Sequence, residues 1–390
     1  MRIATSLLLL GLATGAAHAQ RCGGDFDQFV DDLRAEAIAN GHNAATAAEF
    51  FSHASYLQRA IDADRRQGIF QRPFTDFAGR LISHNRLDNG RRNADRWDAV
   101  FDEAERRFGV SRGVLLAFWA FETDYGAFQG DYNTLDALVT LAHDCRRPEL
   151  FRPQVFAALS LYENGDFDPV NTQGAWAGEI GMLQMLPEDI LTRGIDGDGD
   201  GHVYLQTSAP DALMSGANML SGLGWRSNEP WLVEVDLPQD LDWFDTGIHT
   251  SKTVAEWEAL GVTARNGSLP LRNANASVVI PQGRNGPAFL AYPNFNVLFE
   301  WNQSFVYVMT AAYFATRLEG APVFDAGNPD PGLSGDQMRE LQRRLQALGY
   351  DVGRIDGILG AGTRAAVRAE QRRLGMPADA WPTPALLNRL

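Results

Sequence analysis

An apolar run that ends on a carboxylic acid constrains this chain more than any other feature. Residues 114–121 are apolar without a break, and the next residue is Glu122. Such a run leaves a helix with no polar face, so we expect a helix buried in the core. Ser111 is a favourable N-cap and Gly126 a favourable C′ residue, which places Glu122 in the last helical turn.

Two effects disfavour the charged form of Glu122 at that position. Apolar burial and the negative end of the helix dipole both raise the pKa of a carboxyl group. A carboxylic acid that stays protonated near neutral pH can act as a general acid. A buried Glu that pairs with an Arg for structural reasons explains the same residues equally well, so this stretch alone leaves both interpretations open.

The first residues have the organisation of a secretory signal peptide. Arg2 precedes an apolar stretch, and the small-residue pattern Ala17-His18-Ala19 predicts cleavage after residue 19. The apolar stretch is too short to remain as a membrane span, and no later segment is apolar for long enough to cross a bilayer. We therefore expect residues 1–19 to be removed and a soluble protein to be exported to the periplasm.

The cysteine content and the net charge indicate the cellular compartment of the protein and the kind of partner that it binds. The chain has two cysteines, Cys22 and Cys145, and export places them in an oxidising compartment. A disulfide between them is the simplest pairing, with two free thiols as the alternative. The net charge of −15 argues against nucleic acid or an anionic membrane surface as the main partner.

The pattern along the chain predicts a mainly helical (α+β) protein. Helical periodicity covers residues 24–110, 134–144 and 148–165, and a long apolar helix returns at 304–320. The intervening part is rich in loops, with short β-like runs at 275–283 and 288–293. A Pro- and Gly-rich linker at 321–332 then separates a large domain, residues 20–320, from a small unit at 333–390.

The small unit resembles the three-helix peptidoglycan-binding domain. That domain combines an L-Q-x-x-L helix with spaced glycines, an Asp-Gly pair and a Thr. The matching positions here are Leu341, Gln342, Leu345, Gly349, Gly353, Asp356, Gly357, Gly360 and Thr363. The resemblance implies that peptidoglycan glycan strands are the partner.

Four ordered motifs in residues 24–320 resemble the membrane-bound lytic transglycosylase B family. They are "ETDYG", "DYNTLDALVTLAHDCRRPELF", "WAGEIGMLQMLP" and "NFNVLFEWNQS". The resemblance implies a lysozyme-like catalytic domain that cleaves peptidoglycan between N-acetylmuramic acid and N-acetylglucosamine and leaves 1,6-anhydro ends. It also implies that Glu122 is the single catalytic acid and base, and that the chemistry requires no cofactor.

The same resemblance assigns residues to the substrate cleft and shows where this chain departs from the family. Gln184 and Asn302 match cleft residues of the family. Ala175 stands where Ser is common, which removes one hydrogen bond to the sugar or the acid, and Trp301 stands where Tyr is common. Glu179 replaces a small residue; we interpret it as a solvated loop residue, with a second cleft carboxylate as the alternative.

Two side chains close to Glu122 are assigned separately. Asp124 lies two residues further on, so it projects roughly 200° around the helix and cannot share the cleft. Because no second carboxylate is supplied locally, a lone acid fits a reaction in which the sugar provides its own nucleophile. Tyr125 either stacks on a sugar ring or packs in the core, and the sequence does not decide between these roles.

The stretch "DGDGDGH" has the spacing of a calcium loop. Carboxylates at alternate positions with Gly at the sharp turn suit a cation that takes six to eight oxygen ligands. The predicted ligands are Asp196, Asp198, Asp200 and the carbonyl of His202, with Gly201 at the turn. Position 12 is Thr207 rather than an acid, and Asp211 could replace it in a longer loop. The family carries a similar loop, which favours a structural calcium ion over an Asp-Gly turn that binds nothing.

Two other functions remain as alternatives at this point. A hydrolytic muramidase would use water where the transglycosylase uses a sugar hydroxyl. A non-catalytic wall-binding scaffold would need neither the acid nor the two matched cleft residues, and their retention argues against it. The sequence leaves the oligomeric state open.

Overall fold

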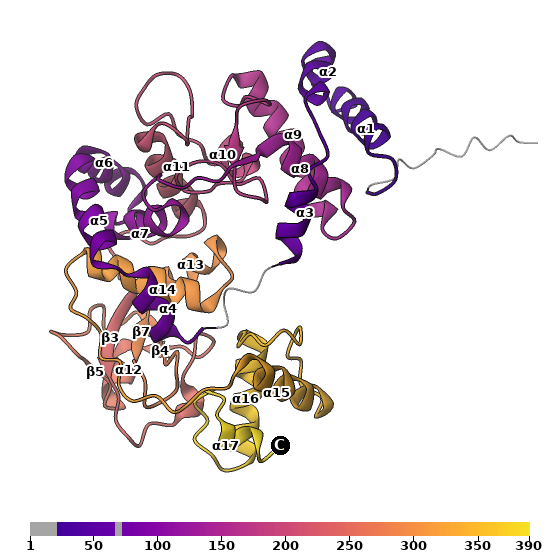
Figure 1. The fold of residues 1–390 in the computed structure, drawn as a ribbon. Helices are drawn as coiled ribbons and strands as arrows, with labels where there is room; N and C mark the ends of the chain where they lie inside the picture. The colour runs from indigo at the N-terminus through magenta and orange to yellow at the C-terminus, as the bar shows by residue number, and fades with distance from the viewer. Residues whose placement is uncertain (1–21, 67–71) are drawn as a thin grey trace, which may run out of the picture.

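The computed structural model describes residues 22–66 and 72–390 (Figure 1). The predicted signal peptide at residues 1–19 lies outside the described residues. Within the described part of the chain, no helix combines the length and apolar character needed to cross a membrane.

Helices dominate the chain up to residue 320 and confirm the expected fold class. The first nine helices are α1 (Phe26–Ala39), α2 (Ala44–Ser52), α3 (Gln58–Arg65), α4 (Phe74–Leu81), α5 (His84–Arg96), α6 (Asp98–Phe108), α7 (Arg112–Thr123), α8 (Thr134–His143) and α9 (Pro148–Asn164). Five more follow: α10 (Pro187–Arg193), α11 (Ala209–Gly222), α12 (Val254–Ala259), α13 (Pro293–Trp301) and α14 (Phe305–Leu318).

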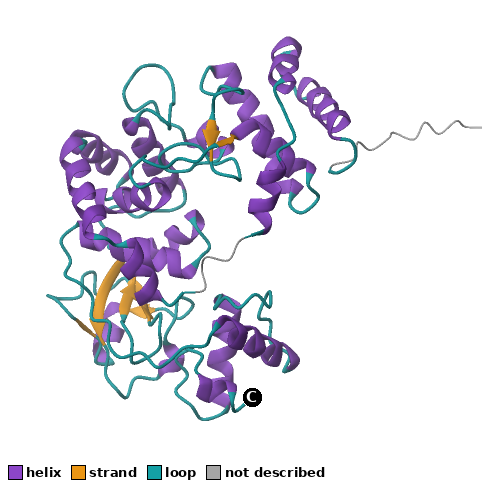
Figure 2. Cartoon of the chain, viewed as in Figure 1, coloured by secondary structure: helices purple, strands orange, loops and turns teal. Residues whose placement is uncertain are grey.

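A five-stranded antiparallel sheet lies within the part predicted to be rich in loops (Figure 2). Its strands are β3 (Leu232–Asp236), β4 (Lys252–Thr253), β5 (Thr263–Ala264), β6 (Asn275–Val279) and β7 (Phe289–Ala291), in the order β4-β6-β7-β3-β5. The two β-like runs of the sequence become β6 and β7, which pair with Val278 opposite Leu290. A separate pair, β1 (Tyr132–Asn133) and β2 (Gln173–Gly174), ties the start of α8 to the "WAGEIG" segment.

Helix α7 lies in the main core, as its uninterrupted apolar run predicts. Every residue from Gly113 to Ala120 is buried, and the helix contacts α5, α6, α11 and α14. Burying a large apolar side chain stabilises the folded state by about 1.5–3 kcal/mol relative to exposure. The helix that carries Glu122 is therefore held on all sides by the core.

The C-terminal end of α7 differs in detail from the prediction. The helix ends at Thr123, and its C-cap is Asp124. A C′ residue at Gly126 would have required Tyr125 as the C-cap. Asp124, Tyr125 and Gly126 all have left-handed backbone, with φ of 51°, 61° and 86°. An Asp tolerates this conformation better than most residues, and Arg86 fixes it through an ion pair of 2.9 Å. The predicted C′ position of Gly126 was therefore wrong.

The described N-terminus is fastened to the large unit (residues 22–66 and 72–320). The structure joins Cys22 to Cys145 by a disulfide, the pairing expected from the cysteine count. Gly23 N also donates to the carbonyl of His143 over 2.7 Å.

The C-terminal unit (residues 333–390) has its own small core and three helices. These are α15 (Gly335–Ala347), α16 (Ala361–Arg373) and α17 (Pro384–Leu387). The expected linker contains neither helix nor strand, yet it is attached along its length. The Phe324 ring contacts the Tyr313 ring at 4.8 Å, and Asp325 pairs with Arg265 at 2.9 Å. These contacts fix the segment on the surface of the large unit.

Candidate active site

The carboxylate of Glu122 has two hydrogen-bond donors on one oxygen. Trp301 Nε1 donates to Oε1 over 3.2 Å, and the Tyr307 hydroxyl donates to the same oxygen. Among the described residues, none donates to Oε2. The side chain is enclosed by protein but keeps some solvent exposure. One carboxylate oxygen is therefore held while the other remains available.

Packing fixes both donors. Trp301 is the last residue of α13, and its ring stacks on Phe118 of α7 with centroids 4.4 Å apart. Tyr307 lies in the first turn of α14, whose N-cap is Ser304. Its ring meets Phe121 edge to face at 6.0 Å. The residues on either side of the α13–α14 junction therefore hold the acid in one orientation.

The surroundings raise the pKa of Glu122 from 4.5 to about 7. Burial is the largest cause, the hydrogen bonds from Tyr307 and Trp301 oppose it, and the charge of Glu179 adds to it. No Lys or Arg among the described residues pairs with Glu122, so the alternative of a structural ion pair finds no support. A group with this pKa can both give and take a proton near neutral pH.

Glu179 is not the solvated loop residue that we expected. Its side chain is mostly buried, burial raises its pKa, and its Oε2 has no hydrogen-bond partner. The cause is local: Ala175 N donates to the Glu179 carbonyl over 2.9 Å, and Ile180 and Met185 exchange two backbone hydrogen bonds. These bonds fold the segment inward, so the interpretation of Glu179 as a solvated residue was wrong.

The two predicted cleft residues lie close in sequence to residues that contact Glu122 or its neighbour Thr123. Gln184 lies two residues after Met182, whose carbonyl accepts a hydrogen bond of 2.7 Å from Oγ1 of Thr123, the residue after Glu122. Gln184 has a left-handed φ of 53°, a strained conformation that is common at functional sites. Its Nε2 donates to the Gly181 carbonyl over 2.8 Å. Asn302 directly follows Trp301, and its Oδ1 accepts from Ser304 N over 2.9 Å.

Tyr125 makes the contacts of a packed residue. Its hydroxyl donates to the Arg86 carbonyl over 2.8 Å, and its ring meets Trp119 edge to face at 5.7 Å. Burial raises the pKa of this hydroxyl. These contacts favour the core-packing role that the sequence left open beside sugar stacking.

The structure brings together two of the predicted aspartates and Asp211, the residue named as a possible replacement for Thr207. Oxygens of Asp196, Asp198 and the buried Asp211 all lie within 4.8 Å of one another. Asp200 is outside this group, and its Oδ1 accepts from His202 N over 2.9 Å. Spacing alone assigned Asp200, but α11 supplies Asp211 from beyond the loop. Three clustered carboxylates fit a hard cation such as calcium.

Sequence reasoning did not assign a role to Tyr307 and treated Trp301 only as a departure from the family. The sequence did contain a signal for the helix start, because Ser304 is a favourable N-cap and places Tyr307 at the third helical position. Nothing in the sequence placed that turn against Glu122, which lies 185 residues away.

Two protein-family models match this chain. The Transglycosylase SLT domain family matches residues 25–316, and the putative peptidoglycan binding domain family matches residues 334–390. Membrane-bound lytic murein transglycosylase B of Escherichia coli (strain K12) is 25% identical over 310 residues, which are 75% of this chain and 83% of that protein.

Solved structures share the fold. SltB3 from Pseudomonas aeruginosa, in complex with NAG-anhNAM-pentapeptide, has a TM-score of 0.87 and 36% identity, covering 94% of this chain and 99% of that one. Escherichia coli Slt35, in complex with calcium, has a TM-score of 0.64 and 24% identity over 77% of this chain and 96% of that one, and shows the fold alone.

A mainly helical, lysozyme-like fold with one enclosed acid at the end of a buried helix defines an enzyme that cleaves glycan strands. More specifically, the chain belongs to the Transglycosylase SLT domain family. It is a lytic transglycosylase that acts on peptidoglycan, with a peptidoglycan-binding domain at its C-terminal end.

Proposed function

We propose that Glu122 is the single acid and base of a non-hydrolytic cleavage of the bond between N-acetylmuramic acid and N-acetylglucosamine. The observation that carries this assignment is the arrangement at its carboxylate: Oε1 is held by Trp301 and Tyr307, while Oε2 is left available. The pKa of about 7 supports both protonation states in one catalytic cycle.

The reaction follows from that arrangement. Protonated Glu122 donates to the glycosidic oxygen as the bond to C1 breaks, leaving an oxocarbenium-like or N-acetyl-assisted intermediate. Tyr307 and Trp301 stabilise the resulting carboxylate through their hydrogen bonds. The carboxylate then removes the proton of the muramic C6 hydroxyl, whose oxygen bonds to C1. The proton returns to Glu122, a 1,6-anhydro end forms, and no water is consumed.

Hydrolysis is a second candidate because of Glu179. A hydrolytic muramidase needs a second carboxylate to activate water. Glu179 is mostly buried, and its charge acts on Glu122. In the transglycosylase reaction Glu179 has no chemical step, whereas in hydrolysis its removal would abolish the activation of water.

The substrate-binding roles of Gln184 and Asn302 are part of the same proposal. Among the described residues, Gln184 Oε1 and Asn302 Nδ2 have no hydrogen-bond partner, which leaves both atoms free to bind a sugar. For Tyr125 we propose a role in packing beneath the site instead, because its hydroxyl is already used.

Export, domain division and metal binding complete the proposal. A chain with the predicted signal peptide at 1–19 would act in the periplasm, with catalysis in residues 20–320 and wall binding in residues 333–390. The segment 321–332 connects them. Calcium would stabilise the loop through Asp196, Asp198 and Asp211, and the calcium complex described for Slt35 is consistent with such a site.

Glu122→Gln tests the catalytic assignment. The amide keeps the size of the side chain but can neither donate to the leaving oxygen nor accept from the C6 hydroxyl. General acid–base catalysis contributes roughly 10²–10⁴-fold, and we expect a loss at the upper end because one residue performs both steps. The matched control is the exposed Glu49→Gln, which should release soluble muropeptides at the normal rate. A folded Glu122→Gln variant with more than about a tenth of normal activity would contradict the assignment.

A further inference from the structure

A cavity of about 810 Å³ lies between the large unit and the C-terminal unit. The large unit lines it with the start of α4, the loop at Gly247–His249, the end of β6 and the α13–α14 junction. The C-terminal unit lines it with α16 and with the segment Asp379–Trp381. Glu122 is not among the lining residues, and the proposed reaction does not use this cavity.

Arg364 presents most of its guanidinium to the cavity without a partner. Its Nη2 donates to the carbonyl of Pro281 over 3.0 Å, and the group lies over the Phe305 ring at 4.5 Å. Its Nε is buried and has no hydrogen-bond acceptor. A guanidinium has five N–H donors, so most of them remain unused.

Arg368 lies one turn further along the same face of α16 and is less well paired still. Its buried Nε has no acceptor, and no other part of its guanidinium has a hydrogen bond or an ion pair among the described residues. The end of its guanidinium lies against Gly247, whose backbone is left-handed with a φ of 102°. Two adjacent cations therefore face one cavity with almost no acceptors.

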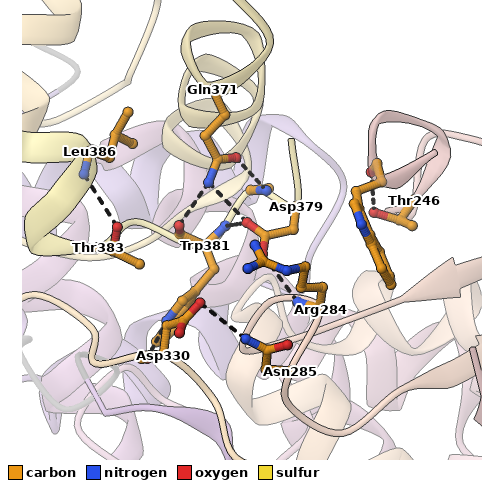
Figure 3. Close-up of polar contacts among 11 residues, drawn as sticks. Thr246, Arg284, Asn285, Asp330, Gln371, Asp379, Trp381, Thr383 and Leu386 are labelled. Atoms are coloured by element: carbon orange, nitrogen blue, oxygen red, sulfur yellow. Dashed lines mark hydrogen bonds and ion pairs between the residues drawn. The ribbon is translucent and has the colours of Figure 1, made fainter. Parts of the chain in front are cut away.

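The charge of Asp379 attracts both arginines, but neither forms an ion pair with it, because its oxygens are already bound by other groups. Asp379 Oδ1 accepts from Gln371 Nε2 over 2.9 Å and from Trp381 N over 3.1 Å. Its Oδ2 accepts from Arg284 N over 3.1 Å, and Figure 3 shows Asp379 between these partners. The other charged lining groups, Arg72, His249 and Glu300, are exposed.

Arg364 stays charged at neutral pH despite its burial. Burial and the charge of Arg368 lower the pKa of Arg364 to about 9, which leaves it cationic at neutral pH. An unpaired buried charge is unfavourable, and an anion with two oxygens in a plane matches the guanidinium fork best. The cavity therefore has the chemistry of a carboxylate-binding site.

We propose that this cavity binds a carboxylate of a peptidoglycan stem peptide through Arg364 and Arg368. The inference rests on the proposed function, because the peptides that branch from the glycan are the source of such carboxylates. The cavity is much larger than a phosphate ion and lies within the roughly 300–1,000 Å³ range of ligand pockets. Phe305 and Trp381 provide apolar wall for the peptide's alkyl groups.

Calorimetric titration of the full chain with a soluble stem tetrapeptide tests this site. The free-acid peptide should bind, and the same peptide with its carboxylates amidated should bind at least about tenfold more weakly, as expected for loss of charge-assisted hydrogen bonds. Arg368→Met keeps the aliphatic length and should weaken free-acid binding by a similar factor. The exposed Arg343→Met, whose arginine already pairs with Glu340, is the matched control and should bind normally.

A melting curve separates loss of the site from loss of the fold. Because Arg368 has no partner, Arg368→Met should melt at or above the temperature of the wild type. Equal binding of the acid and amidated peptides, normal binding by Arg368→Met, or binding of inorganic phosphate but not of the peptide would overturn the proposal.

Cleavage of peptide-free glycan strands by the wild type is measured in parallel. Cleavage without peptide binding overturns the cavity proposal and leaves the catalytic proposal intact. Peptide binding without cleavage supports the carboxylate site and contradicts the catalytic proposal.

Discussion

The acid at the end of α7 and the two arginines on α16 are enclosed groups of opposite charge, and none of them forms an ion pair among the described residues. Glu122 has two neutral donors, and burial raises its pKa to about 7, so it can become neutral by binding a proton. Arg364 keeps its charge at neutral pH even with its pKa lowered to about 9, and among the described residues it has one acceptor, the Pro281 carbonyl. Burial therefore makes Glu122 a group that can transfer a proton, whereas it leaves Arg364 a cation that can bind an anion.

This difference shows why the residue type decides what an enclosed charge can do. A carboxyl group and its conjugate base are both accessible near neutral pH once the pKa has risen. A guanidinium has no neutral form under those conditions, so it remains a binding group. The following experiments test the two sides of this comparison, from the largest expected effect to the smallest.

Removing a donor from the acid should slow the reaction. Tyr307→Phe deletes one of the two hydrogen bonds that hold Oε1 and that stabilise the charged form. A hydrogen bond to a charged group contributes about 1.5–3 kcal/mol, so we expect kcat to fall roughly 10- to 100-fold. The alkaline limb of the pH–rate profile should also move to higher pH, because this bond lowers the pKa of Glu122.

Tyr313→Phe is the control for that variant. Tyr313 lies on the same helix and is buried, but its hydroxyl contacts Arg317 and Phe324 rather than the acid. It should leave the pH–rate profile unchanged. If Tyr307→Phe leaves the rate and the pH–rate profile unchanged, the hydrogen bond from Tyr307 does not contribute to catalysis.

The raised pKa of Glu122 should appear in the stability of the protein. The folded pKa of about 7 exceeds the ordinary 4.5, so the folded state binds the proton more tightly than the unfolded state. The contribution of this group to stability therefore falls as pH rises from 4.5 to 7 and is constant above that. Relative to Glu122→Gln, the wild type should lose about 3 kcal/mol across this interval, since each pKa unit corresponds to about 1.4 kcal/mol.

Chemical denaturation at several pH values measures this difference. The two proteins should show parallel stabilities below pH 4.5 and above pH 7, and should diverge between them. A constant difference at every pH would mean that the acid titrates normally and is not buried in the way that its role requires.

The cluster of Asp196, Asp198 and Asp211 is a third group of charges, and a metal cation would be its counter-ion. We expect 1 mM calcium to stabilise the wild type by about 0.4–1.4 kcal/mol, given a Kd of about 10⁻⁴–10⁻³ M. Asp198→Asn should abolish the rise in Tm, whereas Asp240→Asn, an exposed residue of another loop, should retain it. A Tm that ignores calcium in the wild type would show that the cluster binds no calcium.

The smallest effect concerns Glu179. Its charge raises the pKa of Glu122 but is the last of the causes, so Glu179→Gln should move the alkaline limb to lower pH by less than about one unit. The rate at neutral pH should change little. A loss of roughly 100-fold would favour hydrolysis, in which Glu179 activates water.

The sequence predicted the α7 acid well because its determinants are local. The apolar run, the helix and the position of Glu122 in the last turn all follow from consecutive residues. The run at 304–320 likewise predicted α14 within a few residues. The β-like runs at 275–283 and 288–293 became β6 and β7, whereas β3 was not predicted because its five residues carry mixed burial.

Features that depend on distant segments could not be predicted. Tyr307 reaches Glu122 only because α14 packs on α7. Asp211 was named as an alternative ligand, but the spacing alone could not decide that it, rather than Asp200, joins Asp196 and Asp198. Glu179 was misjudged because backbone pairing within the 174–185 segment turns it inward. The unpaired guanidiniums of α16 become visible only once the two units are in contact.

The most direct test of the central claim is the fate of water in the reaction. Purified protein would digest peptidoglycan in heavy-oxygen water, and mass spectrometry would examine the new muramic acid ends. If Glu122 removes the proton of the C6 hydroxyl and that oxygen bonds to C1, the ends are 1,6-anhydro sugars, one water lighter than hydrolysed ends and free of the heavy isotope. Ends that carry heavy oxygen at C1 would contradict this account and establish hydrolysis.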